Sequence, residues 1–595
     1  MSSEQYHTQK EADEIVLKGV AASPGIAIGT AVTLKKDGIV VEERKAEPVH
    51  DLERLQKSID RSIYELEKIY RTAVDKLGQD KAAIFEAQLL MVSDPIFFSG
   101  VKTRIEAEKK NVEFIVSDEF SKQVRQLRKS DNELFRQRAY EIEDVKNRIL
   151  RNLTEAHLKS KFEGKPIVVT SDLTPADAVL LSRNEVLGYV SDFGGARSHA
   201  SILSRSLGIP AVVGLKDATK HVHDGMKVIL DGYRGVVVFN PTEESVRNYT
   251  EKKEWCEQLD SELLSEASEA ARTTDGRRVL VEANVELLEE LPLLKPHGAD
   301  GIGLFRTEPL IIDAESIPDE EMQFETFRKA VVEATPNPVV FRTFDIGGDK
   351  LFVGDHDEPN PFLGWRGIRM MLDRPDMLKE QFRAILRASV FGKCRIMYPM
   401  VASDEEVVRA NALLEEAKAS LSSAGVAFDR DIEVGVMIEI PSAALMSKEI
   451  ARHVKFLSIG TNDLTQYLLA VDRTNELVAN VFDEFHPSVI RTVKLIIDSG
   501  HGAGIRVAMC GEMAGNPLAT VMLLGLGLDE FSAVSSMLPV LKKIIRGTNY
   551  KSARRFARQI LKLDSADDIK RLLIGYLKTH FERIYHTTIS EEYVE

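Results

Sequence analysis

The C-terminal half of this chain alternates short apolar runs with helical stretches, and this repeat restricts its possible folds more than any other feature. Eight runs are candidates for strands, at residues 279–284, 301–306, 339–345, 395–400, 434–439, 456–462, 506–510 and 530–532. Stretches with helical periodicity lie between them. Eight strand–helix units in succession predict a (β/α)₈ barrel, or TIM barrel, in this half of the chain.

Polar side chains recur at the C-terminal ends of these strand candidates. They are Asn284, Arg306, Arg342, Asp345, Glu439, Asn462, Asp463 and Cys510. Core packing does not explain so many polar groups at equivalent strand ends, and barrels of this type carry their active sites on that face. The pattern therefore predicts a catalytic site at the C-terminal mouth of the barrel.

Two kinds of charged residue lie at this mouth, arginines that suit an anion and carboxylates that suit a metal ion. Arg306 and Arg342 offer planar donor forks for phosphate or carboxylate, although a single arginine in such a place more often forms a salt bridge. Glu439 and Asp463 follow neighbouring strands, and two carboxylates with substrate oxygens and water are typical of a Mg²⁺ site. An acidic pair neutralised by a nearby lysine or arginine is the alternative.

Cys510 follows the seventh strand candidate, so its thiol is expected at the same mouth. A thiol in that place can act as a general acid. A buried and unreactive cysteine is the commoner interpretation of a single cysteine, and the residue pattern alone leaves both interpretations open.

The N-terminal half combines β-rich segments with a helical insertion. Residues 1–14 are polar and predicted to be disordered, and residues 17–29 form a strand-like run. From about residue 50, apolar residues recur every three or four positions, which predicts a long amphipathic helix, with further helices at 80–92, 95–128 and 131–155. Short β-rich runs resume at Pro166, and a charged helical linker spans 242–271.

One β-rich segment has the pattern of a strand, a glycine turn and the start of a helix. An apolar run ends at Val190, the chain breaks at Gly194 and Gly195, and His199 falls in the first helical turn. Free N–H groups and the positive end of a helix dipole stabilise an anion there. The imidazole is therefore a candidate nucleophile that carries a phosphoryl group. A histidine that only caps the helix is the alternative.

The segment around His199 resembles the phosphohistidine segment of the phosphoenolpyruvate (PEP)-utilising enzymes, which include Enzyme I of the sugar phosphotransferase system, PEP synthase and pyruvate phosphate dikinase. The resemblance to Enzyme I rests on residues 194–195, 198–199 and 204–214, and on stretches 17–29, 84–95, 138–145, 360–366, 384–389, 458–467, 470–473 and 526–532. Arg197 stands where the family usually has threonine, and Gln88 stands where many members have histidine.

This resemblance implies a set of roles. PEP would phosphorylate His199 and leave as pyruvate, and the phosphoryl group would pass to a histidine of the carrier protein HPr to start sugar uptake. The matching positions would bind PEP (Arg306, Arg342, Asn462, Asp463 and Arg473), hold Mg²⁺ (Glu439 and Asp463) and protonate the enolate (Cys510). The resemblance also implies a homodimer formed through the barrel.

Together these features predict a multidomain α/β protein. Its predicted parts are a disordered extension at 1–14, an α/β phosphohistidine domain at 15–48 and 156–241, an inserted helical HPr-binding subdomain at 49–155, a helical linker at 242–271, and a PEP-binding and dimerisation TIM barrel at 272–595. The phosphohistidine domain is expected to swing between the barrel and the helical subdomain.

The composition and the N-terminal sequence bear on partners and location. The formal net charge of −15 argues against nucleic acid as a partner, and no apolar run is long enough for insertion into a membrane. Three cysteines lie far apart, and the first residues lack the apolar core of a secretory signal. Both features favour the cytoplasm.

Two other functions fit the sequence less well. An ATP-dependent PEP synthase or dikinase needs a nucleotide-binding domain, for which this chain offers neither room nor a Gly-rich phosphate loop. The order of Gly298, Gly301 and Gly303 does not match a dinucleotide fingerprint. The complete set of arginine, carboxylate and thiol groups opposes a non-catalytic regulatory protein, and only Arg197 favours it.

Overall fold

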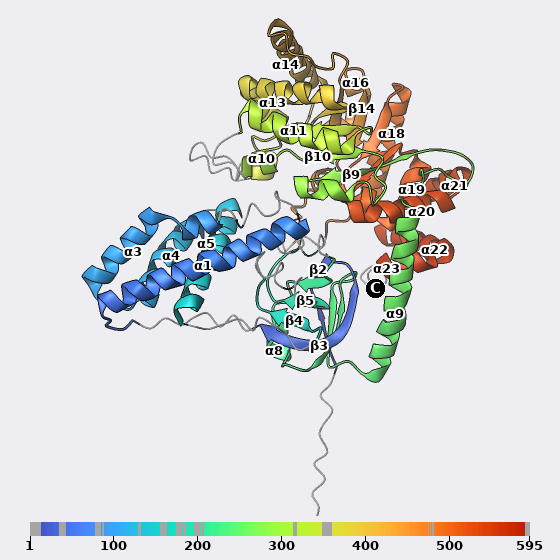
Figure 1. The fold of residues 1–595 in the computed structure, drawn as a ribbon. Helices are drawn as coiled ribbons and strands as arrows, with labels where there is room; N and C mark the ends of the chain where they lie inside the picture. Colours follow the sequence, from blue (N-terminus) through green and yellow to red (C-terminus); the bar gives the residue numbers. More distant parts are fainter. Residues whose placement is uncertain are drawn as a thin grey trace, which may run out of the picture. The chain divides into compact units, whose positions relative to one another are not determined.

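The computed structural model divides into two compact units, Met1–Gln258 and Leu259–Glu595 (Figure 1). The residues that it describes are 14–34, 43–77, 85, 88–128, 133–154, 164–173, 181, 186–195, 201, 204, 208–312, 318–347, 360–473, 475, 478 and 481–588. The extension predicted to be disordered therefore lies outside the described residues, apart from Glu14.

The first unit contains a mixed eight-stranded sheet in the order β1-β8-β7-β3-β4-β5-β6-β2. Its strands are β1 Ile15–Lys18, β2 Val20–Ser23, β3 Ile26–Leu34, β4 Ile167–Thr170, β5 Gly188–Ser191, β6 Ala211–Val213, β7 Lys227–Asp231 and β8 Val236–Phe239. Strands β3 to β6 run parallel, and the outer strands pair antiparallel. Every residue of β4 and β5 is buried, as is typical of the inner strands of a parallel sheet.

A helical insertion separates β3 from β4 in the sequence. Its main helices are α1 Pro48–Leu77, α3 Pro95–Glu108, α4 Val112–Arg128 and α5 Glu133–Thr154, and the short α8 Ala218–His221 follows β6. The apolar stripe of α1, which includes Leu55 and Leu66, packs against α4 and α5 in one core with Val116 and Ile149. The predicted long amphipathic helix is therefore confirmed.

The single helix predicted over 95–128 is wrong, because the chain breaks between α3 and α4. Lys109 has a φ angle of 51°, in the left-handed region where helices often end. Ala46 N–H donates to the Lys109 carbonyl at 3.0 Å, and Asn111 N–H donates to the Arg44 carbonyl at 2.9 Å. This pairing with a distant segment replaces helical hydrogen bonds, and no glycine or proline marks it in the sequence.

The second unit is a closed barrel of eight parallel strands, as predicted. The strands are β9 Leu280–Val285, β10 Ile302–Phe305, β11 Val339–Arg342, β12 Cys394–Tyr398, β13 Glu433–Ile438, β14 Phe456–Ile459, β15 Arg506–Met509 and β16 Glu530–Ala533. A buried layer inside the barrel consists of Leu304, Val340, Met397, Met437, Phe456 and Cys510. This cluster extends from Phe456, at the start of β14, to Cys510, which follows the C-terminal end of β15.

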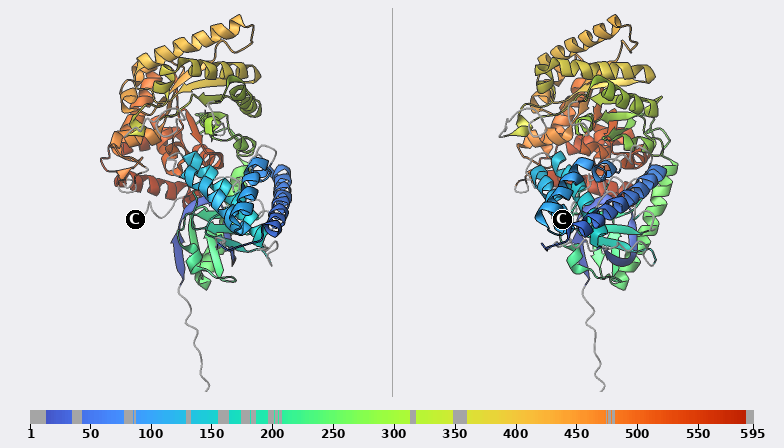
Figure 2. Two further views of the ribbon diagram at one scale, coloured as in Figure 1. Left: turned by 90° about the vertical axis from the view of Figure 1, so that its left-hand side faces the viewer. Right: turned by 60° about the vertical axis from the view of Figure 1, so that its left-hand side comes forward.

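Helices alternate with these strands and cover the outside of the barrel (Figure 2). They are α10 Pro309–Ile312, α11 Glu320–Ala334, α12 Ile368–Asp373, α13 Pro375–Ala388, α14 Asp404–Ser423, α15 Pro441–Leu445, α16 Ser447–Ile450, α17 Thr461–Leu469, α18 Pro487–Gly502, α19 Pro517–Leu526 and α20 Leu538–Gly547, followed by α21 Tyr550–Ile560, α22 Ala566–His580 and α23 Glu582–Thr588. None of the helices in the described ranges is long and apolar enough to cross a membrane.

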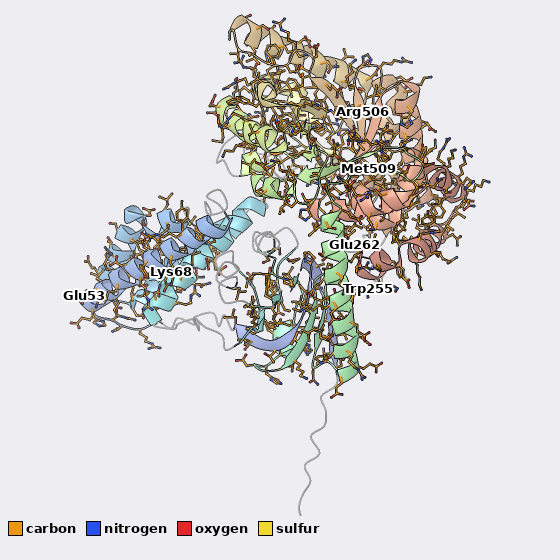
Figure 3. All side chains as sticks on the ribbon, turned by 45° about the vertical axis from the view of Figure 1, so that its right-hand side comes forward. Glu53, Lys68, Trp255, Glu262, Arg506 and Met509 are labelled. Carbon is orange, nitrogen blue, oxygen red and sulfur yellow. The ribbon has the colours of Figure 1, made fainter. Side chains whose placement is uncertain are left out.

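Helix α9, Glu243–Ser265, lies within the predicted linker and carries Trp255 and Glu262 (Figure 3). Near the middle of the helix, Lys252 forms an ion pair with Asp231, which is buried in β7. Toward its end, Glu262 accepts from Lys543 and from Arg583, each at 2.7 Å. Each of these ion pairs lies within one unit, the first in Met1–Gln258 and the other two in Leu259–Glu595.

A carboxyl group, Glu282 of β9, is fully buried inside the barrel. Neither of its oxygens has a hydrogen-bond partner within the described ranges. Burial, and then the nearby charge of Glu530, raise the pKa of Glu282 to about 8. A Cβ at Gly303 would lie 2.7 Å from its Oε2, and one at Gly301 would lie 3.1 Å from its Oε1. These two glycines therefore make room for Glu282.

Replacement of Glu282 by glutamine should stabilise the barrel at alkaline pH and have little effect below about pH 4. A carboxyl whose pKa rises on folding from 4.5 to about 8 is neutral in both states at low pH. As the pH rises toward 8, only the unfolded state ionises freely, so the wild-type barrel loses on the order of 3 kcal/mol. Calorimetry should show a higher Tm for E282Q at about pH 8, and an equal shift at both pH values would contradict this explanation.

Candidate active site at the mouth of the barrel

The polar residues predicted at the strand ends lie at one mouth of the barrel. Those on or directly after a strand end are Arg342 in β11, Arg306 after β10, Glu439 after β13 and Cys510 after β15, and Asn462 and Asp463 lie in the first turn of α17. Because all eight strands are parallel, their C-terminal ends meet at the same rim. The structure therefore brings these residues to one rim, as their positions along the strands predict.

Arg342 is held in the mouth by acidic partners. Its Nη2 lies 3.0 Å from Oε2 of Glu308, and its Nη1 lies 3.4 Å from Oδ2 of Asp345. Burial alone would lower the pKa of Arg342, but the charges of Glu308, Asp345 and Glu439 raise it above its ordinary value. Its Nε is buried and has no hydrogen-bond partner in the described part of the chain.

Arg366 is a second guanidinium in the mouth. Its Nε and Nη2 donate to the two oxygens of Asp345 at 3.1 and 2.7 Å, and Nη2 also lies 3.4 Å from Oδ2 of Asp463. Burial alone would lower its pKa, but these two carboxylates raise it. Arg366 therefore joins the end of β11 to the first turn of α17.

Glu439 is buried beside two further carboxylates. Its Oε1 accepts the backbone N–H of Met400 at 2.6 Å, and Met400 has a φ angle of 56°, which is unfavourable for a residue with a side chain. Burial, and then the negative charges of Asp463 and Asp345, raise the pKa of Glu439 to about 8. A divalent cation would offset this repulsion, although no group of three or more acidic, His or Cys side chains in the described ranges is arranged to hold a metal ion.

Two other arginines predicted to bind PEP have different surroundings. Arg306 donates from Nη1 to Oε1 of Glu286 at 3.2 Å, in a partly exposed pair. The backbone N–H of Arg473 donates to Oε1 of Gln466 at 3.2 Å. Within the described ranges the guanidinium of Arg473 forms no ion pair, so the structure does not bring it into the network around Arg342 and Arg366.

Cys510 follows Met509, the last residue of β15, which is labelled in Figure 3. The thiol of Cys510 is buried. Ser458 Oγ donates to its Sγ at 3.3 Å. Burial raises the pKa of the Cys510 thiol to about 11, although the hydrogen bond from Ser458 and the charge of Arg342 act in the opposite direction. The thiol therefore stays protonated at neutral pH, as a general acid must be.

His199 and Arg197 lie outside the described residues, so the structure does not place either side chain. The residues around them keep the predicted pattern. Strand β5 ends at Ser191, Gly194 has a φ angle of 117°, and Ser201 is helical. Ser201 Oγ donates to the Gly195 carbonyl at 2.8 Å.

Comparisons with known proteins identify the family. Three models of PEP-utilising enzymes match the chain, the N-terminal one at residues 18–138, the mobile domain at 162–235 and the PEP-binding domain at 261–550. The phosphoenolpyruvate-protein phosphotransferase of Haemophilus influenzae is 39% identical over 569 residues, which are 94% of this chain and 99% of the relative. The chain belongs to the family of phosphoenolpyruvate-protein phosphotransferases.

Two further matches are reported for comparison. The relative from Geobacillus stearothermophilus is 40% identical over 96% of this chain and 98% of its own length. A solution structure of an Enzyme I protein is 38% identical to this chain, of which it covers 40%, with 99% of its own length matched and a TM-score of 0.36. The identities to the two phosphotransferases confirm the predicted resemblance to Enzyme I.

Several residues at this mouth of the barrel were not predicted from the sequence. Arg366 ends the stretch 360–366 that resembles Enzyme I, so that stretch was the available signal. Glu308 lies two residues after Arg306, and Glu512 lies two residues after Cys510. No local sequence pattern marks Met400, because its contact with Glu439 depends on its backbone conformation.

Proposed function

We propose that the chain transfers the phosphoryl group of PEP to His199 and then to a histidine of the carrier protein HPr, releasing pyruvate. One observation supports this most directly. The barrel mouth combines buried guanidinium groups, a crowded set of carboxylates and a protonated thiol. These groups match the anionic head, the divalent ion and the enolate of PEP cleavage.

The arginines would hold PEP in the mouth. Arg306 is only partly buried, and the buried Nε–H of Arg342 has no partner in the described ranges, so we assign both to phosphate or carboxylate oxygens. Asn462 and Arg473 would complete the binding set, and Asp463 would contribute through the ion. Since Arg342 already pairs with Glu308 and Asp345, PEP binding requires these pairs to rearrange.

Glu439 and Asp463 would hold Mg²⁺, which would supply positive charge to the phosphoryl oxygens during transfer. The bond between phosphorus and a ring nitrogen of His199 forms as the bridging P–O bond of PEP breaks. The electron pair remains on the enolate oxygen. Cys510 then gives its proton to the methylene carbon, which completes pyruvate, and the thiolate regains a proton from solvent.

Other parts of the chain would serve the second transfer. We assign the phosphohistidine domain to 15–48 and 156–241, HPr binding to the helices within 49–155, the linker to 242–271, and PEP binding and homodimer formation to the barrel at 272–595. A cytoplasmic location is part of this proposal, and the three widely separated cysteines favour it.

Labelled PEP tests this function directly. The full chain incubated with PEP labelled in phosphate and with Mg²⁺ should acquire acid-labile, base-stable label, and peptide mapping should locate it at His199. Addition of HPr should move the label to HPr, and chelation of Mg²⁺ should prevent labelling. Label at a residue other than His199, or ATP hydrolysis coupled to pyruvate, would contradict the proposal.

A further inference from the structure

Asn462 and Glu512 form a reciprocal pair of hydrogen bonds at the rim of the mouth. Asn462 Nδ2 donates to Oε1 of Glu512 at 3.0 Å, and the backbone N–H of Glu512 donates to Oδ1 of Asn462 at 2.8 Å. If the Asn462 amide were rotated by 180°, its NH₂ group would face the N–H of Glu512 and its oxygen would face the Glu512 carboxylate. Neither contact would then be a hydrogen bond. The pair therefore fixes the rotation of the Asn462 amide and leaves one of its N–H groups for a ligand.

The loops that carry these two residues also touch along their backbones. The N–H of Cys510 donates to the Ile459 carbonyl at 3.1 Å. A Cβ at Gly511 would fall 2.0 Å from Oγ1 of Thr461, so only glycine allows this approach. The segment with the thiol is thus fastened to the one that begins α17, and displacement of one would move the other.

From this geometry we infer that Glu512 is a positioning residue that aligns Asn462 for the substrate and holds the Cys510 loop against α17. The inference rests on the proposed function, in which Asn462 binds PEP. Glu512 is exposed, and exposed polar pairs add little to folding stability. Its carboxylate also repels an anionic substrate. The effect of Glu512 on the geometry of the site can therefore be tested apart from its effects on folding stability and on the charge of the mouth.

Two substitutions separate hydrogen bonding from charge. In E512A the Asn462 amide loses one of its two contacts, and the KM for PEP should rise about tenfold, the effect of one lost hydrogen bond to a charged group. In E512Q the amide oxygen still accepts from Asn462, so the KM should stay within about twofold of wild type. The Tm of both variants should stay within about 2 °C of wild type, as for most surface changes.

The test measures pyruvate release by the full chain in the presence of PEP and Mg²⁺. In an N462A background, E512A should add less than about a twofold change, because Glu512 acts through Asn462. Glu380→Ala, at an exposed position of α13, is the matched control. An unchanged KM in E512A, or equal defects in E512A and E512Q, would overturn the inference. Failure of wild type itself to acquire label from PEP would instead overturn the proposed function.

Discussion

Replacement of His199 by alanine should abolish phosphoryl transfer from PEP and lower pyruvate release at least about 10⁴-fold. The proposed reaction passes through an obligatory covalent intermediate, so without the imidazole the phosphoryl group has no acceptor. Labelled PEP and Mg²⁺ should then leave no label on the protein. His223→Ala, at an exposed histidine of the same unit, is the matched control and should leave labelling intact.

The same variant should still bind PEP. His199 belongs to the unit Met1–Gln258, whereas the residues proposed to bind PEP belong to Leu259–Glu595. PEP at about one hundred times its Kd stabilises the folded barrel by about 2.7 kcal/mol, so H199A and wild type should show the same rise in Tm. A missing rise would mean that the substitution damages the protein more widely, and labelling that persists would place the nucleophile elsewhere.

The barrel could be predicted from the sequence because its signal is local and repeated. Each strand is a short apolar run followed by a helix, and all eight predicted runs overlap the observed strands. The end of β14 was predicted too late, because α17 begins at Thr461 and takes Asn462 and Asp463 into its first turn. The break after Lys109 could not be predicted, because it depends on pairing with the segment before α1.

The site was predictable only where position along a strand decides it. Residues at strand ends share a rim in any parallel barrel, so Arg306, Arg342 and Glu439 could be placed in advance. Arg366 could not, because it lies in a loop and reaches Asp463 across 97 positions of sequence. The raised pKa of Glu439 likewise depends on carboxylates from other strands and on burial, neither of which a local pattern reveals.

Replacement of Cys510 by alanine should lower kcat for pyruvate formation by about 10² to 10⁴, the usual contribution of a general acid. PEP binding should change little, because the thiol acts on the methylene carbon after the P–O bond breaks. Cys394→Ala is the matched control, since Cys394 is also buried but begins β12, at the opposite end of the barrel. A loss of kcat as large in C394A would indicate damage to the barrel and not loss of a proton donor.

The pH dependence of kcat tests the same role without a substitution. An acid must be protonated to donate, so the raised pKa of the Cys510 thiol, about 11, extends the active range upward. The thiol should therefore impose no loss of kcat between about pH 7 and 10, whereas an ordinary thiol would impose one near its pKa of about 8.5. Burial should also make Cys510 slow to react with iodoacetamide at about pH 8. Rapid alkylation there, with kcat falling near pH 8.5, would show that the thiol ionises too easily to be the proton donor at higher pH.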